Sequence, residues 1–454
     1  MTTVLAVSTN RERRTERLDA EYYASPLQGV VSQMAGTALE WITLPSAAMS
    51  LRSGGTPPGH RLDVGEVPFI TIECIEPLWL DMSRTGRVLR IHREKLLRRV
   101  WLREGDVLIT IKRRIANAAV VYAEAQDSVV NQDVAVLRPN GRIPPEVIVA
   151  CLSSRVGQSQ ARLRQTEQIN PYLSVTSLRK LTLPLLPEGV QNRVIELVRQ
   201  RVELQRSAEE CIVNAMAEVS RAARIRQGAA HSSAIASISS LRLLRRLDSE
   251  FYCRAQLSFE EDVNTHPLGS PKISSYLSSG VTPAAAEYSL TGPPIFKVGG
   301  LSRFSIADWL GDRVDTRSHA AQSLKGRLEV GDVLVLAAAH DTRYIGKAAV
   351  LHQIPSEEQP HAVGELIIIR PTDINGPTLT TYLNIPAVRR AVQRLVRGQS
   401  AHLYPVDLQH LPVPEFSSRL QARVAEWFDL CQDARNRSNE VWRLAIEAIE
   451  MAVG

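Results

Sequence analysis

Two stretches of the chain carry apolar residues at alternating spacings of four and three, the pattern of a helix with one continuous apolar stripe. The stripes share one register at an offset of 230 residues, and each predicts a helix of about 36 residues that begins soon after prolines. Either each helix lies on its own domain or the two helices pair, and the shared register favours pairing. The stripes consist of Val190, Val194, Leu197, Leu204, Ala208, Cys211 and Ala215, and of Leu420, Val424, Trp427, Cys431, Ala434, Val441, Ala445 and Ala448.

Short apolar runs, separated by Gly and Asp residues, precede each helix and predict strands. Short helices are expected at 145–157 and 377–394. Each long helix therefore follows a mixed globule of helices and strands. The predicted strands are 107–111, 118–122 and 134–137 in the first half of the chain, and 333–336, 348–351 and 366–369 in the second.

The sequence also repeats itself once. The matching pairs are RLDAEYY (17–23) and RLDSEFY (246–252), SGGTP (53–57) and SGVTP (279–283), LREGDVLIT (102–110) and LEVGDVLVL (328–336), and IANAAVV (115–121) and IGKAAVL (345–351). Their offset stays between 226 and 232, and each copy of about 220 residues is far too long for a solenoid repeat. The chain is therefore predicted to be a tandem duplication of an α+β domain followed by a long helix.

Composition adds little to this picture. The chain has 54 Lys and Arg against 48 Asp and Glu, a net charge of +6, which only weakly indicates a polyanionic partner. Five scattered cysteines without a CxxC pair predict neither zinc nor a disulfide framework. No apolar run approaches the roughly 20 residues of a membrane span, and the N-terminus lacks a signal-peptide core. We expect a cytoplasmic protein without a membrane partner.

Taken in order, these segments resemble the specificity subunits of Type I restriction–modification systems. The resemblance is carried by SGGTP (53–57), LREGDVLIT (102–110), NQDVAVLRP (131–139), INPYLS (169–174) and LTLPLLPEGVQNRVIELV (181–198), then by the long helix and the second copy. It implies two target-recognition domains joined by two helices in an antiparallel coiled coil. The implied boundaries are 1–184 and 246–414 for these domains, 185–227 and 415–454 for the spacer helices, and 228–245 for a linker.

The resemblance further implies that the chain reads a bipartite, asymmetric sequence of double-stranded DNA. It implies that two adenine-N6 methyltransferase subunits dock on the helices and use S-adenosylmethionine, and that motor-nuclease subunits complete a restriction enzyme. The second copy departs from the pattern, with VGELIIIRP at 363–371 and SAHLYP at 400–405. Two alternatives stay open: a recognition subunit of a related phage-defence system, and a stand-alone DNA-binding or scaffolding protein.

DNA reading requires cations for phosphates and hydrogen-bonding side chains for base edges. Loops beside the predicted strands contain side chains of both kinds. A basic triplet after a strand can instead be a solvated edge, and Asn-Gln before a strand can be a turn cap. The candidates are Arg52, Thr56, Lys112, Arg113, Arg114, Asn131, Gln132, Arg164 and Gln165 in the first copy, and His340, Arg343, Lys347, Arg397 and Gln399 in the second.

A catalytic role for this chain is not expected. Asn170-Pro171-Tyr172 resembles the Asn/Asp-Pro-Pro-Tyr motif of amino-methyltransferases but lacks one proline, and no Gly-rich loop follows a strand to hold S-adenosylmethionine. No clustered carboxylates with a lysine suggest a nuclease, and no Walker loop suggests a motor. We therefore expect no metal and no cofactor in this chain, with S-adenosylmethionine bound by the partner methyltransferase.

Overall fold

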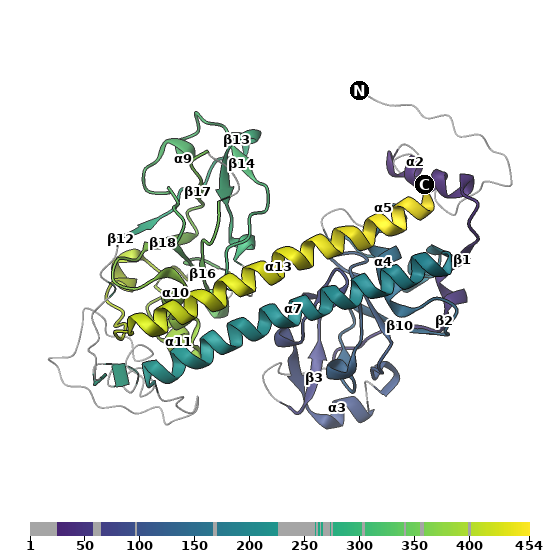
Figure 1. The fold of residues 1–454 in the computed structure, drawn as a ribbon, viewed down its shortest axis with the longest axis horizontal. Coiled ribbons are helices and arrows are strands. Elements are labelled where there is room, and N and C mark those ends of the chain that lie inside the picture. Colours follow the sequence, from purple (N-terminus) through teal and green to yellow (C-terminus); the bar gives the residue numbers. More distant parts are fainter. Residues whose placement is uncertain are drawn as a thin grey trace. The chain divides into compact units, whose positions relative to one another are not determined.

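The computed structural model describes residues 25–57, 65–95, 98–166, 170–225, 259, 262–263, 265–266, 273, 276–301, 305–339, 342–354, 358–397 and 401–454 (Figure 1). The predicted linker at 228–245 and both RLD-containing openings lie outside the described residues. The chain folds into two compact units: unit 1 comprises residues up to 205 together with 435–454, and unit 2 comprises 206–434. The domain boundaries implied by the resemblance stay a prediction.

Unit 1 contains a four-stranded antiparallel sheet and a three-stranded sheet with one parallel pair. The four-stranded sheet has the order β2 (Ala48–Ser53), β10 (Val134–Pro139), β7 (Val107–Thr110) and β8 (Ala118–Val120). The second sheet has the order β6 (Gly86–Val88), β3 (Val67–Ile70) and β9 (Val129–Val130), with β3 and β9 parallel. All three strands predicted in this half are confirmed.

Unit 2 contains the same two sheets with the same strand directions. The first has the order β12 (Tyr276–Ser279), β18 (Leu366–Arg370), β15 (Val333–Leu336) and β16 (Ala348–Val350). The second has the order β14 (Arg313–Val314), β13 (Tyr288–Phe296) and β17 (His361–Ala362), with β13 and β17 parallel. The strands predicted in this half are confirmed, and the repeat found in the sequence is a repeat of the fold.

The predictions of single short helices at 145–157 and 377–394 are wrong in one respect, because the structure has two consecutive helices in each region. In unit 1, α4 (Pro145–Ser153) ends at Ser154, whose extended backbone and hydroxyl cap the next helix by accepting the Gly157 amide (3.3 Å). In unit 2, the break falls at Ile385, since the residue before a proline is disfavoured in helical conformation. The helices that follow are α5 (Arg155–Arg164) and, after α10 (Gly376–Asn384), α11 (Pro386–Arg394).

The remaining short elements connect these layers. They are α2 (Leu27–Gln33), β1 (Trp41–Thr43), β4 (Ile75–Glu76), β5 (Trp79–Leu80), α3 (Arg90–Lys95), α6 (Val175–Leu178), β11 (Thr182–Pro184), α9 (His319–Gln322) and α12 (Pro405–Leu408). Strand β1 pairs with β11, and β4 pairs with β5.

One ion pair recurs in both units and explains two residues of the repeated motifs. Asp106 of the first Gly-Asp turn accepts two hydrogen bonds from the Arg138 guanidinium (2.8 and 2.7 Å), and Asp332 does the same with Arg370 (2.9 Å for both). Each aspartate is buried, and hydrogen bonding to it raises the pKa of its arginine above the ordinary value. The repeated Asp and Arg therefore hold the sheet together.

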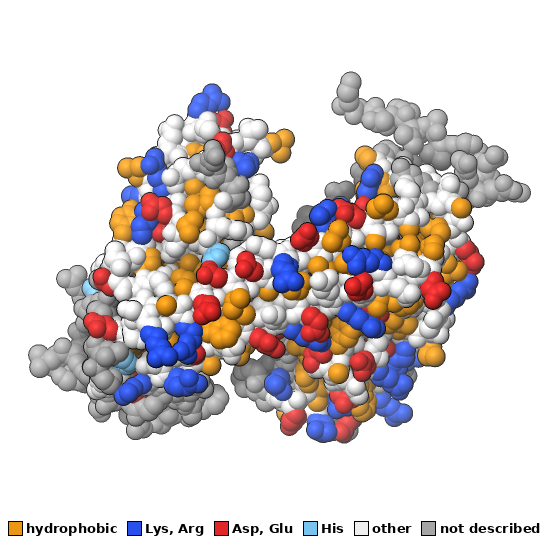
Figure 2. Space-filling model, in the orientation of Figure 1, with side chains coloured by type: hydrophobic (Ala, Val, Ile, Leu, Met, Phe, Trp, Pro, Cys, Tyr) orange, Lys and Arg blue, Asp and Glu red, His pale blue; other side chains and the backbone are white. Residues whose placement is uncertain are grey.

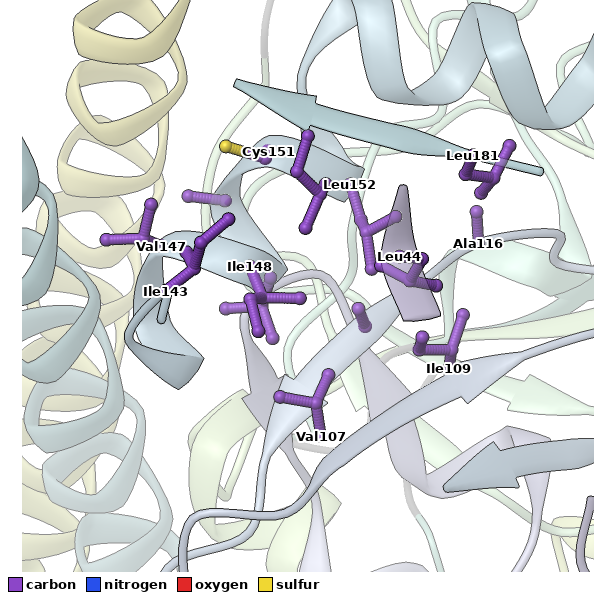
Figure 3. Close-up of a cluster of buried hydrophobic side chains, with 14 of the residues drawn as sticks. Leu44, Val107, Ile109, Ala116, Ile143, Val147, Ile148, Cys151, Leu152 and Leu181 are labelled. Atoms are coloured by element: carbon purple, nitrogen blue, oxygen red, sulfur yellow. The ribbon is translucent and has the colours of Figure 1, made fainter. Parts of the chain in front are cut away.

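The core of unit 1 lies between its four-stranded sheet and the long helices (Figure 3). Helix α4 fills this layer: Ile148 and Leu152 lie in one buried cluster with Val107 and Leu44. The same cluster reaches the long helices through Leu197 and other side chains of the predicted stripes. Burial of each large aliphatic side chain contributes about 1.5–3 kcal/mol, so this layer fixes the helices to the sheet.

The two long helices, α7 (Glu188–Ala223) and α13 (Ser418–Val453), are 36 residues each, and they pair within each unit. In unit 1, Val194 and Leu197 of α7 share a buried cluster with Val441 and Ala445 of α13. In unit 2, the Arg423 guanidinium lies 2.9 Å from Glu218. The first part of α7 thus meets the last part of α13, and the reverse holds in unit 2. The helices are antiparallel, and the interpretation that they pair is confirmed.

The apolar stripes are interrupted at positions 201 and 438, and the structure brings these two residues together. The buried Arg201 donates through Nη1 to the Ser438 carbonyl (2.8 Å) and hydroxyl (3.2 Å), and through Nε to the Pro77 carbonyl (3.1 Å). Gln205 donates to the same hydroxyl (2.9 Å). Burial lowers the pKa of Arg201 to about 10, so it stays charged at neutral pH. A buried polar contact in an apolar seam favours one helix register, which we infer here.

None of the helices in the described part of the chain combines the length and the apolar character that a membrane span needs.

Candidate nucleic-acid interface

Three loops meet beside the four-stranded sheet of unit 1. The Gly54 amide donates to the Val134 carbonyl (2.8 Å) and the Gly55 amide to the Val130 carbonyl (3.1 Å). A Cβ on Gly54 would lie 2.0 Å from the Asn131 carbonyl oxygen, so only glycine allows this approach. The Ile111 amide donates to the Asp133 carbonyl (3.0 Å), which brings the loop after β7 to the same turn.

The loop after β7 holds the basic triplet. The Arg113 backbone is left-handed (φ 61°), and its amide donates to the Pro171 carbonyl (2.9 Å). The Arg113 side chain is exposed and has no partner among the described residues, whereas Lys112 lies 3.9 Å from Asp133. The Arg114 guanidinium lies 2.9 Å from the Glu76 carboxylate. Burial disfavours the charged form of Arg114, but the interaction with Glu76 has the larger effect, so the pKa of Arg114 is raised above its ordinary value. Of the triplet, Arg113 is the most available for a phosphate.

The polar candidates next to this loop differ in availability. Asn131 Oδ1 accepts a hydrogen bond from the Asp133 amide (3.2 Å). Asn131 therefore caps a turn, which is one of the two roles that the sequence left open. Gln132 and Thr56 are exposed without partners in the described part of the chain, as is Arg52 on β2. These three side chains are free to contact DNA.

Tyr172 connects the remaining first-copy candidates to this site. Its backbone forms bridges with Lys112 and with Thr166, and the latter directly follows Arg164 and Gln165. Arg164 donates to the Gln160 carbonyl (3.2 Å) at the end of α5. All nine first-copy candidates therefore lie on loops, strands or helix ends around one site, although which of them contact DNA stays a prediction.

Unit 2 has the same backbone arrangement at the equivalent positions. The Gly280 amide donates to the Leu366 carbonyl (3.1 Å), and a Cβ on Gly280 would lie 2.2 Å from the carbonyl oxygens of Ala362 and Val363. His402 takes the place of Tyr172, because its backbone forms bridges with Ala338 and Arg397. The frame of the site is thus duplicated.

The second-copy candidates are more occupied than those of the first. Arg397 forms an ion pair with the buried Asp407, and the Lys347 ammonium donates to the Leu301 carbonyl. Arg343 is exposed, and its carbonyl accepts from Arg389 (2.9 Å). His340 and Gln399 lie outside the described residues. Their roles in DNA reading stay predictions.

Two features at or near the site were not among the DNA-reading candidates predicted from the sequence. One is the ring position Tyr172/His402, which only the backbone bridges reveal. The other is the segment 84–104, which contains eight Lys and Arg against two Glu. A sliding count of charge along the chain would have found the second feature.

The described cysteines are candidates for neither metal nor redox chemistry. Cys74, Cys151, Cys211 and Cys431 are buried, and none of these four forms a disulfide. Burial raises the pKa of the Cys74 thiol to about 11 and that of Cys151 to about 12, so both stay protonated at neutral pH. No group of three potential ligands capable of holding a metal ion occurs in the part of the chain that the structure describes.

No protein-family model and no curated protein sequence matches the chain. Among solved structures, it is similar to the HsdS subunit from Thermoanaerobacter tengcongensis (15% identity, 91% of this chain and 96% of that chain, TM-score 0.29). It is also similar to the S subunit of a Type I restriction-modification system from M. genitalium (12%, 92% and 96%, 0.39) and to a chain from a structure of a type I R-M system (16%, 91% and 97%, 0.31). These three solved structures are S subunits or chains of Type I restriction-modification systems.

Proposed function

We propose that this chain is the sequence-specific DNA-recognition subunit of a Type I-like restriction–modification complex and has no catalytic site of its own. The observation that carries the proposal is the duplicated site. Gly54 and Gly280 hold the same backbone approach in the two units, while the side chains around them differ. One frame with two different surfaces suits a protein that reads two different DNA segments.

The paired helices support a bipartite target. A helix of 36 residues, at about 1.5 Å per residue, is about 54 Å long. At about 3.4 Å per base pair this length covers at most about 16 base pairs, and half-sites on one face of DNA lie roughly 34–36 Å apart. Two recognition domains joined by such helices can contact successive turns. The helix length would then set the unread gap, and the diverged copies would read a non-palindromic target.

The candidate residues divide by chemistry into two roles. In the first copy, Arg52, Lys112 and Arg113 suit phosphates, because guanidinium and ammonium groups neutralise them irrespective of sequence. Gln132 and Thr56 suit base edges, since amides pair with adenine in the major groove and hydroxyls accept several partners. In the second copy, Arg343, Arg397 and the undescribed His340 and Gln399 would contact the other half-site.

Catalysis would belong to partner subunits. We propose that two adenine-N6 methyltransferase subunits, which bind S-adenosylmethionine, dock on the α7–α13 pair, and that motor-nuclease subunits complete a restriction enzyme. This assembly is the one that the resemblance to Type I specificity subunits implies.

Methylome sequencing of the host, with and without this gene, tests the proposal. We expect one split adenine-methylation motif, with two specified runs and a fixed gap, to disappear on deletion. We also expect a methyltransferase to co-purify with the tagged chain. An unchanged methylome, together with a chain that purifies alone and still binds one bipartite site, would instead establish a stand-alone DNA-binding protein.

A further inference from the structure

Charge is concentrated in one segment of unit 1. Residues 84–104 carry eight Lys and Arg and two Glu, a net charge of +6, which equals the net charge of the whole chain. The equivalent segment of the second copy, 310–330 at a constant offset of 226, carries four Lys and Arg against three Asp and Glu. The basic character of the chain therefore belongs to one copy.

Two of the cations in this segment are held by the fold. Arg84 forms ion pairs with Asp81 (3.0 Å) and Glu76 (3.3 Å). Arg93 pairs with Asp127 (3.1 Å) and lies 3.5 Å from the centre of the Trp101 ring, with only 11% of its side chain exposed. The carboxylates already neutralise the charges of these two arginines, so their role is to hold the segment in place and not to bind a ligand.

Four other arginines face solvent. Arg87 donates to the Glu66 carbonyl (3.2 Å), and Arg90, Arg98 and Arg103 are exposed with no side-chain partner among the described residues. Figure 2 shows Lys and Arg side chains gathered over the part of unit 1 that carries α3. Unpaired cations on one short segment repel each other, so an anionic ligand would stabilise their solvent-facing arrangement.

The segment adjoins the candidate DNA site through a shared carboxylate. Glu76 Oε1 accepts from Arg84 (3.3 Å) and from Arg114 of the loop after β7 (2.9 Å). The basic segment therefore begins where the basic triplet ends. A ligand that contacts both the basic segment and the loop after β7 must be extended and must carry negative charges at regular intervals. The backbone of DNA has these properties.

Unit 2 has no counterpart of this surface at the described positions. Thr316, Leu324 and Glu329 stand where the first copy has Arg90, Arg98 and Arg103. Two positions keep a cation: Arg313 is the equivalent of Arg87, and Lys325 is the equivalent of Arg99. The Arg313 guanidinium lies 2.8 Å from the Glu358 carboxylate.

We propose that the exposed Arg87, Arg90, Arg98 and Arg103 form a phosphate-binding surface for duplex DNA flanking the first half-site, so that the first copy supplies most of the salt-dependent affinity. This inference rests on the proposed function. Since each neutralised phosphate contributes about 0.9 to the slope of log affinity against log salt, three arginines contribute about two to three. The second copy recognises its half-site with a smaller electrostatic contribution.

The test compares two triple variants of the full chain, purified with whatever subunits accompany it. Arg90→Gln/Arg98→Gln/Arg103→Gln removes three charges from the first copy, and the matched control Arg317→Gln/Lys325→Gln/Arg327→Gln removes three from the equivalent segment of the second. Binding to a 40-base-pair duplex of mixed sequence is measured by fluorescence anisotropy between about 50 and 200 mM salt. Circular dichroism melts check that both variants fold.

We expect the first variant to make the salt slope shallower by about two to three and the control to change it by less than about one. Equal changes in both variants, or none in the first, overturn the inference. A first variant that keeps its slope but no longer retains its partner subunits overturns it as well, since the surface then binds protein. If the wild-type chain binds no duplex, the proposed function fails rather than this inference alone.

Discussion

The two copies share a frame and differ in the surface that it presents. Asp106–Arg138 and Asp332–Arg370 are the same buried ion pair, and Gly54 and Gly280 make the same close backbone approach. Around that frame, the loop 112–114 has become a longer loop, and the basic segment 84–104 has become nearly neutral. The residues that hold the frame are therefore not the residues that differ on the surface.

The helix pair also differs between the two units. Arg201 and Ser438 form a buried polar contact in unit 1, whereas their equivalents, Cys431 and Ala208, are buried in unit 2 as small apolar groups. A symmetric seam could pair in several registers with similar energy, and one polar contact on one side removes that degeneracy.

The largest expected effect comes from breaking the shared frame. Asp106→Ala should cost about 2–3 kcal/mol of unfolding free energy, because it leaves the partly buried Arg138 without its carboxylate. Asp332→Ala should cost about 1–3 kcal/mol, since Arg370 keeps an ion pair with the exposed Glu329 (2.8 Å). Urea unfolding measures both, and the exposed Glu104→Ala should stay within about 0.5 kcal/mol. A large loss in only one copy would show that the frame is not shared.

Next in size is the contact that distinguishes the two halves of the helix pair. Ser438→Ala should cost about 1–3 kcal/mol, because two buried donors lose the hydroxyl that they share. The double variant Arg201→Met/Ser438→Ala should cost less than the sum of the two single changes, since it no longer contains the guanidinium that Ser438→Ala deprives of an acceptor, and only Gln205 then lacks the hydroxyl. Additive urea-unfolding energies would contradict the proposed register contact.

A base contact should act on only one half of the target. Gln132→Ala should weaken binding by about 1–3 kcal/mol and relax selectivity at a single base pair, because the second copy has Gly364 at this position and no equivalent amide. Binding to a library of single-base target variants measures this. A uniform loss over all variants would assign Gln132 to the backbone instead.

The smallest effect is expected for one phosphate contact. Arg113→Ala should make the salt slope shallower by about one for every sequence and change stability by less than about 0.5 kcal/mol, since its exposed side chain has no partner among the described residues. The exposed Arg142, paired with Glu40, supplies the control Arg142→Ala. An equal slope for Arg113→Ala and wild type would remove this residue from the interface.

The sequence predicts the repeated frame well, because the strands and stripes follow from local apolar periodicity and the repeat follows from matching segments at a nearly constant offset. It places the strands and long helices within a few residues, and even the gaps in the stripes at 201 and 438 mark a real contact. It misses the helix breaks at Ser154 and Ile385, where capping and a proline outweigh periodicity. The sequence also cannot show that Arg114 and Arg397 form ion pairs whereas Arg113 has no partner among the described residues. The carboxylates that bind them, Glu76 and Asp407, lie 38 and 10 residues away along the chain.

The central claim is that two homologous domains in one chain read two separate DNA segments. Hydroxyl-radical footprinting of the purified chain, with its co-purifying subunits, on DNA selected for tight binding tests this most directly. The account predicts two protected patches with unequal sequences and a fixed, unspecified interval between them. A single uninterrupted patch, unaffected by changes in one of the two domains, would contradict it.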